Sequence, residues 1–195
     1  EDTDYVEVNP GKHRIICKTK NGPEVVVLNS PFPFREEKEY TVSLTGKLER
    51  NDLQLVFITD SCPPNRNLAQ LKFTNAVPES IPVDLSIKYG PTLYSNLAFR
   101  TGGGCQLIPP DSYLFQLTSS RTGEEIFEKE LKLEAGIRYN VFAAASQDGG
   151  RAEFITLTKQ NIPEEVPKIF GIERSVLQLL GAGLIASLVI LVIGR

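Results

Sequence analysis

The chain has 195 residues, with 21 Lys plus Arg against 24 Asp plus Glu and a formal net charge of −3. This balance excludes a strongly basic nucleic-acid binder and an acidic disordered tail, so we expect no nucleic-acid partner. Hydrophobic residues make up 41%, which is typical of a globular protein. Because the sequence contains no Met, we interpret it as a processed or trimmed chain from which any signal peptide is gone.

Residues 1 to 160 consist of short apolar runs in which apolar and polar residues alternate, separated by Pro, Gly, Asn and Asp. This spacing predicts a mainly β protein made of small antiparallel β-sandwiches, not a parallel α/β sheet. The predicted strands are 24–28, 40–44, 54–58, 70–73, 83–87, 113–117, 139–143 and 153–157.

An internal repeat divides this β region. The stretch that contains Pro10 and Tyr40 recurs about 100 residues later, where Pro110 and Tyr139 take the same places. The repeat predicts two modules in tandem, residues 1–61 and residues 62–160.

The second module also contains residues 68–104, which have no counterpart in the first. We therefore expect the first module to be incomplete at its N-terminus, with the missing strands lying upstream or supplied by another chain. An incomplete sandwich exposes a sheet edge, and such an edge pairs readily with a partner.

The three cysteines are Cys17, Cys62 and Cys105. Cys17 aligns with Leu117 of the second module, so we expect a buried thiol. Cys62 and Cys105 either form a disulfide or remain reduced, and the choice depends on geometry that a sequence does not contain.

Residues suited to catalysis are scarce. His13 is the single histidine and aligns with Tyr113, so we expect a structural role and no catalytic set around it. One histidine and three scattered cysteines do not have the standard spacing of a zinc site, and we predict no catalytic residue, no metal and no cofactor. Residues 102–104 are three glycines without the Lys-Ser/Thr of a phosphate loop, which predicts a flexible hairpin loop. Acidic residues at strand ends are expected to cap turns: Asp60, Asp84, Asp111 and Asp148.

Phe32 and Phe34 lie between prolines in the run SPFPF. Pro on both sides of Phe32 argues against a regular central strand. Two interpretations stay open: the rings belong to the core, or they form an exposed loop that docks a partner.

The end of the chain has a different pattern. Residues 161–174 begin with IPEEVP and predict a Pro-rich, acidic spacer. Residues 176–193 contain no charge, and as a helix they would extend about 27 Å, close to the hydrocarbon thickness of a bilayer. We therefore predict a transmembrane helix over 175–194, with a fully buried core helix as the alternative. Small residues on one face predict helix packing against other membrane subunits: Ala182, Gly183, Ala186 and Ser187.

The second module resembles a secreted bacterial domain of unknown function. Residues 68–87, LAQLKFTNAVPESIPVDLSI, are similar to that family's opening strand, roughly R-F-V-[HN]-A-S-P-D-A-P-A-V-D-V, although Thr74 and Ile81 depart from it. Residues 93–99, 108–117 and 134–143 resemble its later strands. A weaker similarity is to the accessory protein of alginate O-acetylation, AlgF, which has tandem β-sandwich modules. The resemblance covers most of residues 1–160 and implies exported, often tandem β-sandwich modules without established catalysis.

Orientation in the membrane rests on two opposing indications. Lys168 and Arg174 precede the predicted helix and only Arg195 follows it, which weakly favours a cytoplasmic bulk. The family resemblance favours the extracytoplasmic side, and we give it more weight. We therefore expect a single-pass membrane protein with its β modules outside the cytoplasm.

The expected function is non-enzymatic: an accessory or structural subunit of a membrane protein complex. Its expected partners are the lipid bilayer and other membrane subunits, reached through the predicted helix and the open sheet edge. The alternatives are a cell-surface module for adhesion or polysaccharide binding, and an accessory protein in polysaccharide O-acetylation.

Overall fold

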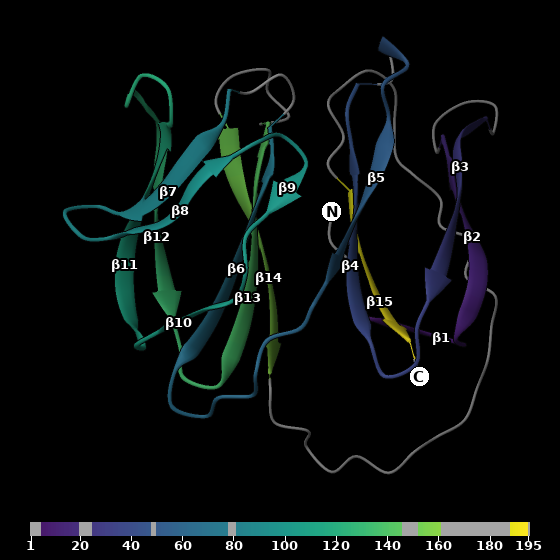
Figure 1. Ribbon diagram of the computed structural model, residues 1–195, viewed down its shortest axis with the longest axis horizontal. Helices are drawn as coiled ribbons and strands as arrows, with labels where there is room; N and C mark the ends of the chain where they lie inside the picture. Colours follow the sequence, from purple (N-terminus) through teal and green to yellow (C-terminus); the bar gives the residue numbers. More distant parts are fainter. Residues whose placement is uncertain are drawn as a thin grey trace. The chain divides into compact units, whose positions relative to one another are not determined.

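The computed structural model describes residues 5–19, 25–47, 50–77, 81–145, 152–160 and 188–194, and these residues are mainly β (Figure 1). The first group of strands is β1 Val6–Val8, β2 Gly11–Lys18, β3 Val26–Phe34, β4 Glu39–Thr45 and β5 Gln54–Thr59. The second group is β6 Ala69–Ala76, β7 Val83–Ile87, β8 Thr92–Leu97, β9 Thr101–Gly102, β10 Gln106–Ile108, β11 Asp111–Ser119, β12 Glu125–Leu133, β13 Ile137–Ala145 and β14 Ala152–Gln160. Each of the eight predicted strands overlaps an observed strand.

The chain divides into two compact units, Glu1–Asp60 with Glu164–Arg195, and Ser61–Pro163. We call the first unit module 1 and the second module 2. Strand β15 (Leu188–Gly194) belongs to module 1, although it lies at the other end of the chain.

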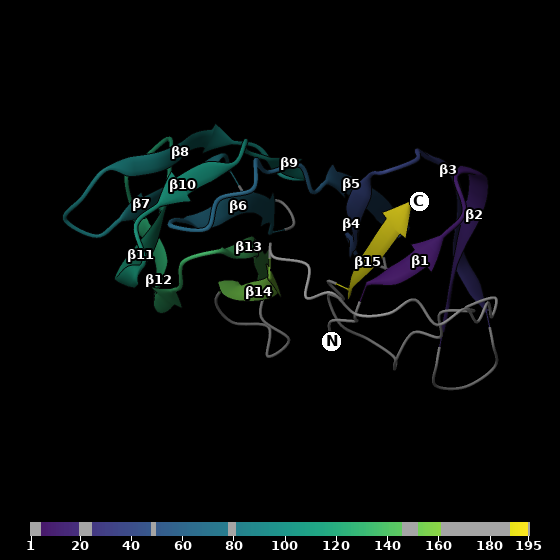
Figure 2. The same ribbon diagram turned by 90° about the horizontal axis from the view of Figure 1, so that it is seen from below.

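Module 2 consists of two packed sheets (Figure 2). One sheet has the order β10-β6-β13-β14 with β9 on β6, and the other has the order β12-β11-β7-β8. Most neighbouring strands run antiparallel, as the sequence predicted, but β6 and β13 are parallel. Between β6 and β13 the chain crosses to the second sheet at β7 and β8, returns at β9 and β10, and crosses again at β11 and β12. This route lets β6 and β13 run in the same direction.

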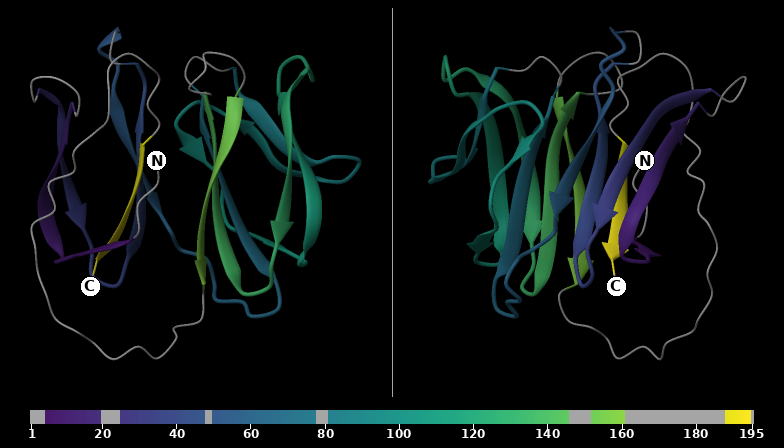
Figure 3. Two further views of the ribbon diagram at one scale, coloured as in Figure 1. Left: turned by 180° about the vertical axis from the view of Figure 1, so that it is seen from behind. Right: turned by 45° about the vertical axis from the view of Figure 1, so that its right-hand side comes forward.

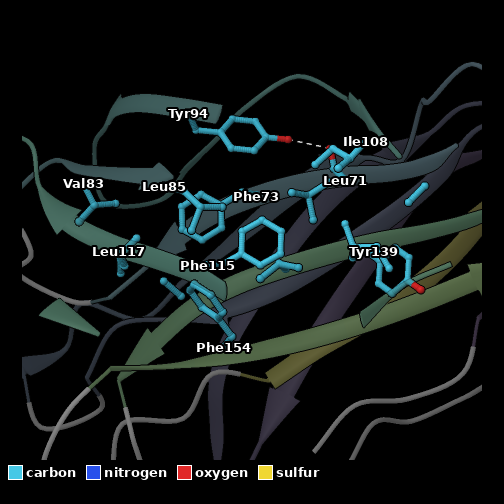
Figure 4. Packing of buried hydrophobic residues seen from close by; sticks show 14 residues of the cluster. Leu71, Phe73, Val83, Leu85, Tyr94, Ile108, Phe115, Leu117, Tyr139 and Phe154 are labelled. Atoms are coloured by element: carbon cyan, nitrogen blue, oxygen red, sulfur yellow. Dashed lines mark hydrogen bonds between the residues drawn. The ribbon is translucent and has the colours of Figure 1, made fainter. Parts of the chain in front are cut away.

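The core of module 2 lies between these sheets (Figure 4). Phe73 of β6, Phe115 of β11 and Val141 of β13 are each at most 1% exposed. They come from alternate positions of their strands, because successive side chains of a strand point to opposite faces. The alternation that the sequence shows is therefore what fills this core.

Module 1 has a smaller described core. Its sheets are β1-β15-β4-β5 and the pair β2-β3 (Figure 3). Val42 and Leu44 of β4 pack with Cys17, Phe34 and Tyr40. Within the described residues, module 1 has no counterpart of β7 and β8.

Similar hydrogen bonds occur at positions of the two modules that the predicted repeat aligns. In module 1, the His13 ring Nε2 lies 2.8 Å from the carbonyl oxygen of Asn9, and in module 2 the Tyr113 hydroxyl donates to the Pro109 carbonyl at 3.0 Å. Each bond reaches four residues back along the chain. The hydroxyl groups of Tyr40 and Tyr139 likewise each accept a backbone N–H from five residues earlier, Arg35 and Glu134.

The C-terminal predictions fall largely outside the described residues, because 161–187 is not described. This range contains the predicted spacer, most of the predicted transmembrane helix and its small-residue face, Ala182, Gly183, Ala186 and Ser187. Residues 188–194 are described as strand β15, not as helix. In the described part of the chain, none of the structure is a helix of the length and apolar character that crossing a membrane requires.

Candidate functional site

The candidate site is the turn that joins β7 to β8 in module 2, which extends away from the two sheets (Figure 1). The Gly90 N–H donates to the Ile87 carbonyl at 2.8 Å and closes a four-residue turn. The Lys88 N–H donates to the Leu114 carbonyl at 2.7 Å, which ties the turn to β11. The backbone of this tip is therefore held at both ends by hydrogen bonds.

Tyr89 occupies the third position of this turn and is 99% exposed. Its φ angle is 62°, in the left-handed region that turns usually give to Gly or Asn. A non-glycine residue there costs about 1–2 kcal/mol. The ring recovers none of this cost through burial, because almost all of its surface faces solvent.

Lys88, the residue before Tyr89, makes an ion pair and approaches the Tyr89 ring. The Lys88 ammonium pairs with the Glu128 carboxylate of β12, and this hydrogen bond raises the pKa of Lys88. The same Nζ lies 5.8 Å from the centre of the Tyr89 ring, within the range of a cation–π contact.

The tip can act as a contact point for another macromolecule. A tyrosine combines a large apolar ring with a polar hydroxyl, and such residues are frequent at the energetic centres of protein interfaces. Four other described residues that are not glycine also have positive φ angles, so the exposure of the ring together with the strain distinguishes Tyr89. Nothing in the arrangement around Tyr89 resembles a catalytic set.

The structure joins Cys62 to Cys105 in a disulfide whose Cα atoms are 5.6 Å apart and whose residues are separated by 43 positions. The bond connects the start of module 2 to the segment just before β10. Cys17 is a buried free thiol of module 1, as its alignment with Leu117 predicted, and burial raises its pKa.

The three glycines at 102–104 are not a flexible loop, which corrects the prediction. Gly102 pairs with Thr74 of β6, and the Gly103 N–H donates to the Phe73 carbonyl at 2.9 Å. The buried Tyr94 hydroxyl lies 2.7 and 2.9 Å from the Leu71 and Gly104 carbonyl oxygens, which share its single proton. Glycine is needed here because a Cβ at Gly103 would lie 2.1 Å from the Tyr94 ring.

Phe32 and Phe34 belong to the core, so the docking-loop interpretation is wrong. Both lie in β3, where Phe34 is buried and Phe32 stacks on Phe57 with ring centres 3.8 Å apart. The flanking prolines, Pro31 and Pro33, are accommodated because β3 pairs with β2 alone and its other edge needs no N–H donors.

Asp111 accepts the N–H of the next residue, Ser112, at 2.8 Å, whereas Asp84 and Asp60 accept hydrogen bonds from residues more distant in the chain. Asp84 accepts the Asn96 N–H at 2.7 Å, and Asp60 accepts the hydroxyls of Thr41 at 2.6 Å and Tyr5 at 3.1 Å. In the described ranges, His, Cys, Asp and Glu side chains form no group of three or more that could hold a metal. Asp148 lies outside these ranges.

The fold defines a β-rich protein with sandwich-like modules, and one of its turns carries an exposed tyrosine. A family model described as a domain of unknown function, DUF4397, matches residues 1–86. The matched part covers module 1 before the C-terminal strand, the junction, and the opening strands of module 2. No curated protein matches the sequence.

One similar solved structure is that of a "putative cell adhesion protein" from Bacteroides uniformis ATCC 8492. The two proteins are 13% identical, with a TM-score of 0.34, over 73% of this chain and 78% of that chain.

Sequence reasoning missed Tyr89 as a site residue. The run KYGP at 88–91, between two predicted strands, is a turn signal that places an aromatic residue at a hairpin tip. The left-handed conformation and the exposure of the ring come only from the structure.

Proposed function

We propose that this chain is a non-enzymatic, membrane-anchored binding protein whose β modules lie outside the cytoplasm and contact a protein partner through the Tyr89 tip. In this role it is an accessory subunit of a membrane complex. The observation that carries the proposal is the fully exposed tyrosine held in a strained conformation on a turn anchored by hydrogen bonds.

The disulfide supports the extracytoplasmic location. Disulfides form and persist in oxidising compartments and are rare in the reducing cytosol. The Cys62–Cys105 bond closes a long loop in module 2, and in such a loop a crosslink restricts the unfolded chain strongly.

The proposed anchor is the uncharged segment within 175–194. It cannot serve as a membrane helix while residues 188–194 pair with β4 and β1, because the same residues form both. Anchoring therefore requires release of β15 from module 1.

The contact can be tested by site-specific photo-crosslinking in native membranes. A photoreactive phenylalanine analogue replaces Tyr89 in the full chain, and the control chain carries it at Thr122, an exposed residue of the turn between β11 and β12. We expect a discrete crosslinked protein from position 89 and none from position 122. Equal labelling from both positions, or none from either, would refute the tip as the contact.

Adhesion to another cell is the second candidate, favoured by the outward extension of the same tip. Crosslinking distinguishes the two, because a subunit of the same complex is captured in isolated membranes of one cell and an adhesion partner only when cells are mixed. Polysaccharide binding and a role beside acetyltransferases stay as further alternatives, and neither has a specific residue arrangement in its favour.

A further inference from the structure

The two modules differ at one place in their main sheets. The orders β1-β15-β4-β5 and β10-β6-β13-β14 correspond strand for strand, so β15 takes the place that β6 has in module 2. β6 is parallel to β13 and antiparallel to β10. β15 is antiparallel to β4 and parallel to β1, so it runs in the opposite direction.

The repeat also shows which residues a strand in the direction and register of β6 would place against β4. Tyr139 and Tyr40 correspond, and therefore Phe142 corresponds to Ser43. In module 2, Leu71 lies opposite Tyr139 and Thr74 lies opposite Phe142. A strand of the β6 type in the same register would therefore bring a hydroxyl to Ser43.

The strand that occupies the place does not match this chemistry. Val189, which has no hydrogen-bonding side chain, lies opposite Ser43. Ser43 is 1% exposed, and its Oγ has no hydrogen-bond partner among the described residues. A buried hydroxyl without a partner is costly, so the sheet is better suited to a strand with a polar residue at this position.

We infer that the place between β1 and β4 is an acceptor site for an extended segment of another protein, which runs parallel to β4 and alternates apolar with polar residues as β6 does. Leu188–Gly194 occupies the site in the partner's absence. Addition of a strand to a sheet supplies affinity through backbone hydrogen bonds and specificity through alternate side chains. The inference rests on the proposed function only in that the partner is a protein, and it is independent of the Tyr89 tip.

A peptide with the sequence of residues 68–77, LAQLKFTNAV, is a direct probe of this site. The full chain in detergent is titrated with the fluorescent peptide, and the control peptide has the same composition with the alternation broken. We expect saturable binding of the first peptide, at least about tenfold tighter than the control. Equal binding of the two peptides, or none, would overturn the inference.

Competition with β15 gives a second readout. An Ile190→Asp substitution destabilises the strand that holds the place, so the peptide should bind the variant about tenfold more tightly, because the site is vacant for more of the time. Hydrogen exchange should show residues 188–194 becoming exposed while β4 stays protected. Unchanged affinity and unchanged exchange would contradict the displacement.

The direction of the bound peptide is testable as well. A photoreactive group at its C-terminal end should label the Thr45 end of β4, and labelling at the Tyr40 end would overturn the parallel arrangement. A Tyr89→Gly chain should bind the peptide as the unaltered chain does. The strand site and the tip therefore fail in separate experiments.

Discussion

A single added methyl group should destabilise module 2 at Gly103 but not at the neighbouring Gly104. A Cβ on residue 103 would lie 2.1 Å from Cδ1 and 2.2 Å from Cε1 of the Tyr94 ring, whereas a Cβ on residue 104 meets nothing within 4 Å. Tyr94 is buried, and its ring must move by more than roughly 1 Å to make room for the added methyl group. Gly103→Ala is therefore a test of the packing around Tyr94.

The expected cost has two parts. Overpacking of a core costs about 1–3 kcal/mol. Displacement of the Tyr94 hydroxyl also weakens the hydrogen bond that its proton shares between the Leu71 and Gly104 carbonyls, at about 1 kcal/mol. Gly103→Ala should therefore lower the unfolding free energy of module 2 by about 3 kcal/mol, whereas Gly104→Ala should change it by less than about 0.5 kcal/mol.

Hydrogen exchange measured by mass spectrometry resolves the two modules and so suits this comparison. For peptides from β6 and β11, a loss of about 3 kcal/mol corresponds to exchange roughly 100-fold faster in Gly103→Ala. Exchange in Gly104→Ala should match the unaltered chain. Similar exchange in both variants would refute the account of the glycine segment as a packed element.

Three further predictions concern module 2. Burial raises the pKa of Tyr94 above its ordinary value, so above a pH of about 10 the residue ionises in the unfolded chain but not in the folded one. The unfolding free energy should therefore fall as the pH rises above about 10. Urea unfolding of the unaltered chain and of Tyr94→Phe should show a smaller fall in the variant. Replacing Cys62 and Cys105 together by Ala opens a loop of 43 residues and should lower the unfolding free energy by about 4 kcal/mol in the chain-entropy model. A reductant should destabilise the unaltered chain but not this variant. A loss of unfolding free energy under about 1 kcal/mol would contradict the estimate. Tyr89→Gly relieves the left-handed strain and should raise the unfolding free energy by about 0.5–1 kcal/mol, whereas a decrease would contradict the strain argument.

Local patterns predicted most of the strands because alternation and turn residues act over a few positions. The period-two runs around Phe73, Phe115 and Val141 fill the core of module 2 as the pattern indicates. The match of Pro10 with Pro110 and of Tyr40 with Tyr139 predicts the repeat, and similar hydrogen bonds lie at the aligned positions of both modules. The parallel pairing of β6 with β13 could not be predicted, because it depends on the route between two sheets.

Features that depend on three-dimensional proximity could not be predicted from the sequence. The uncharged segment at 176–193 has neither a helical nor a strand period, so its pattern does not distinguish a membrane helix from a strand such as β15. The prolines beside Phe32 and Phe34 left the core and docking-loop interpretations open, and the choice required the structure, in which β3 pairs with β2 and accommodates the prolines. Tyr89 needed a φ angle and an exposed surface to be recognised.

The central claim is that the Tyr89 tip binds a partner and does not stabilise the module. Quantitative co-purification from native membranes tests it most directly, with the unaltered full chain compared with Tyr89→Gly at equal expression. The account predicts that the substitution lowers the recovered partner by at least about tenfold, as for an interface hot spot, although it stabilises module 2. Undiminished recovery of the partner with Tyr89→Gly would contradict the claim.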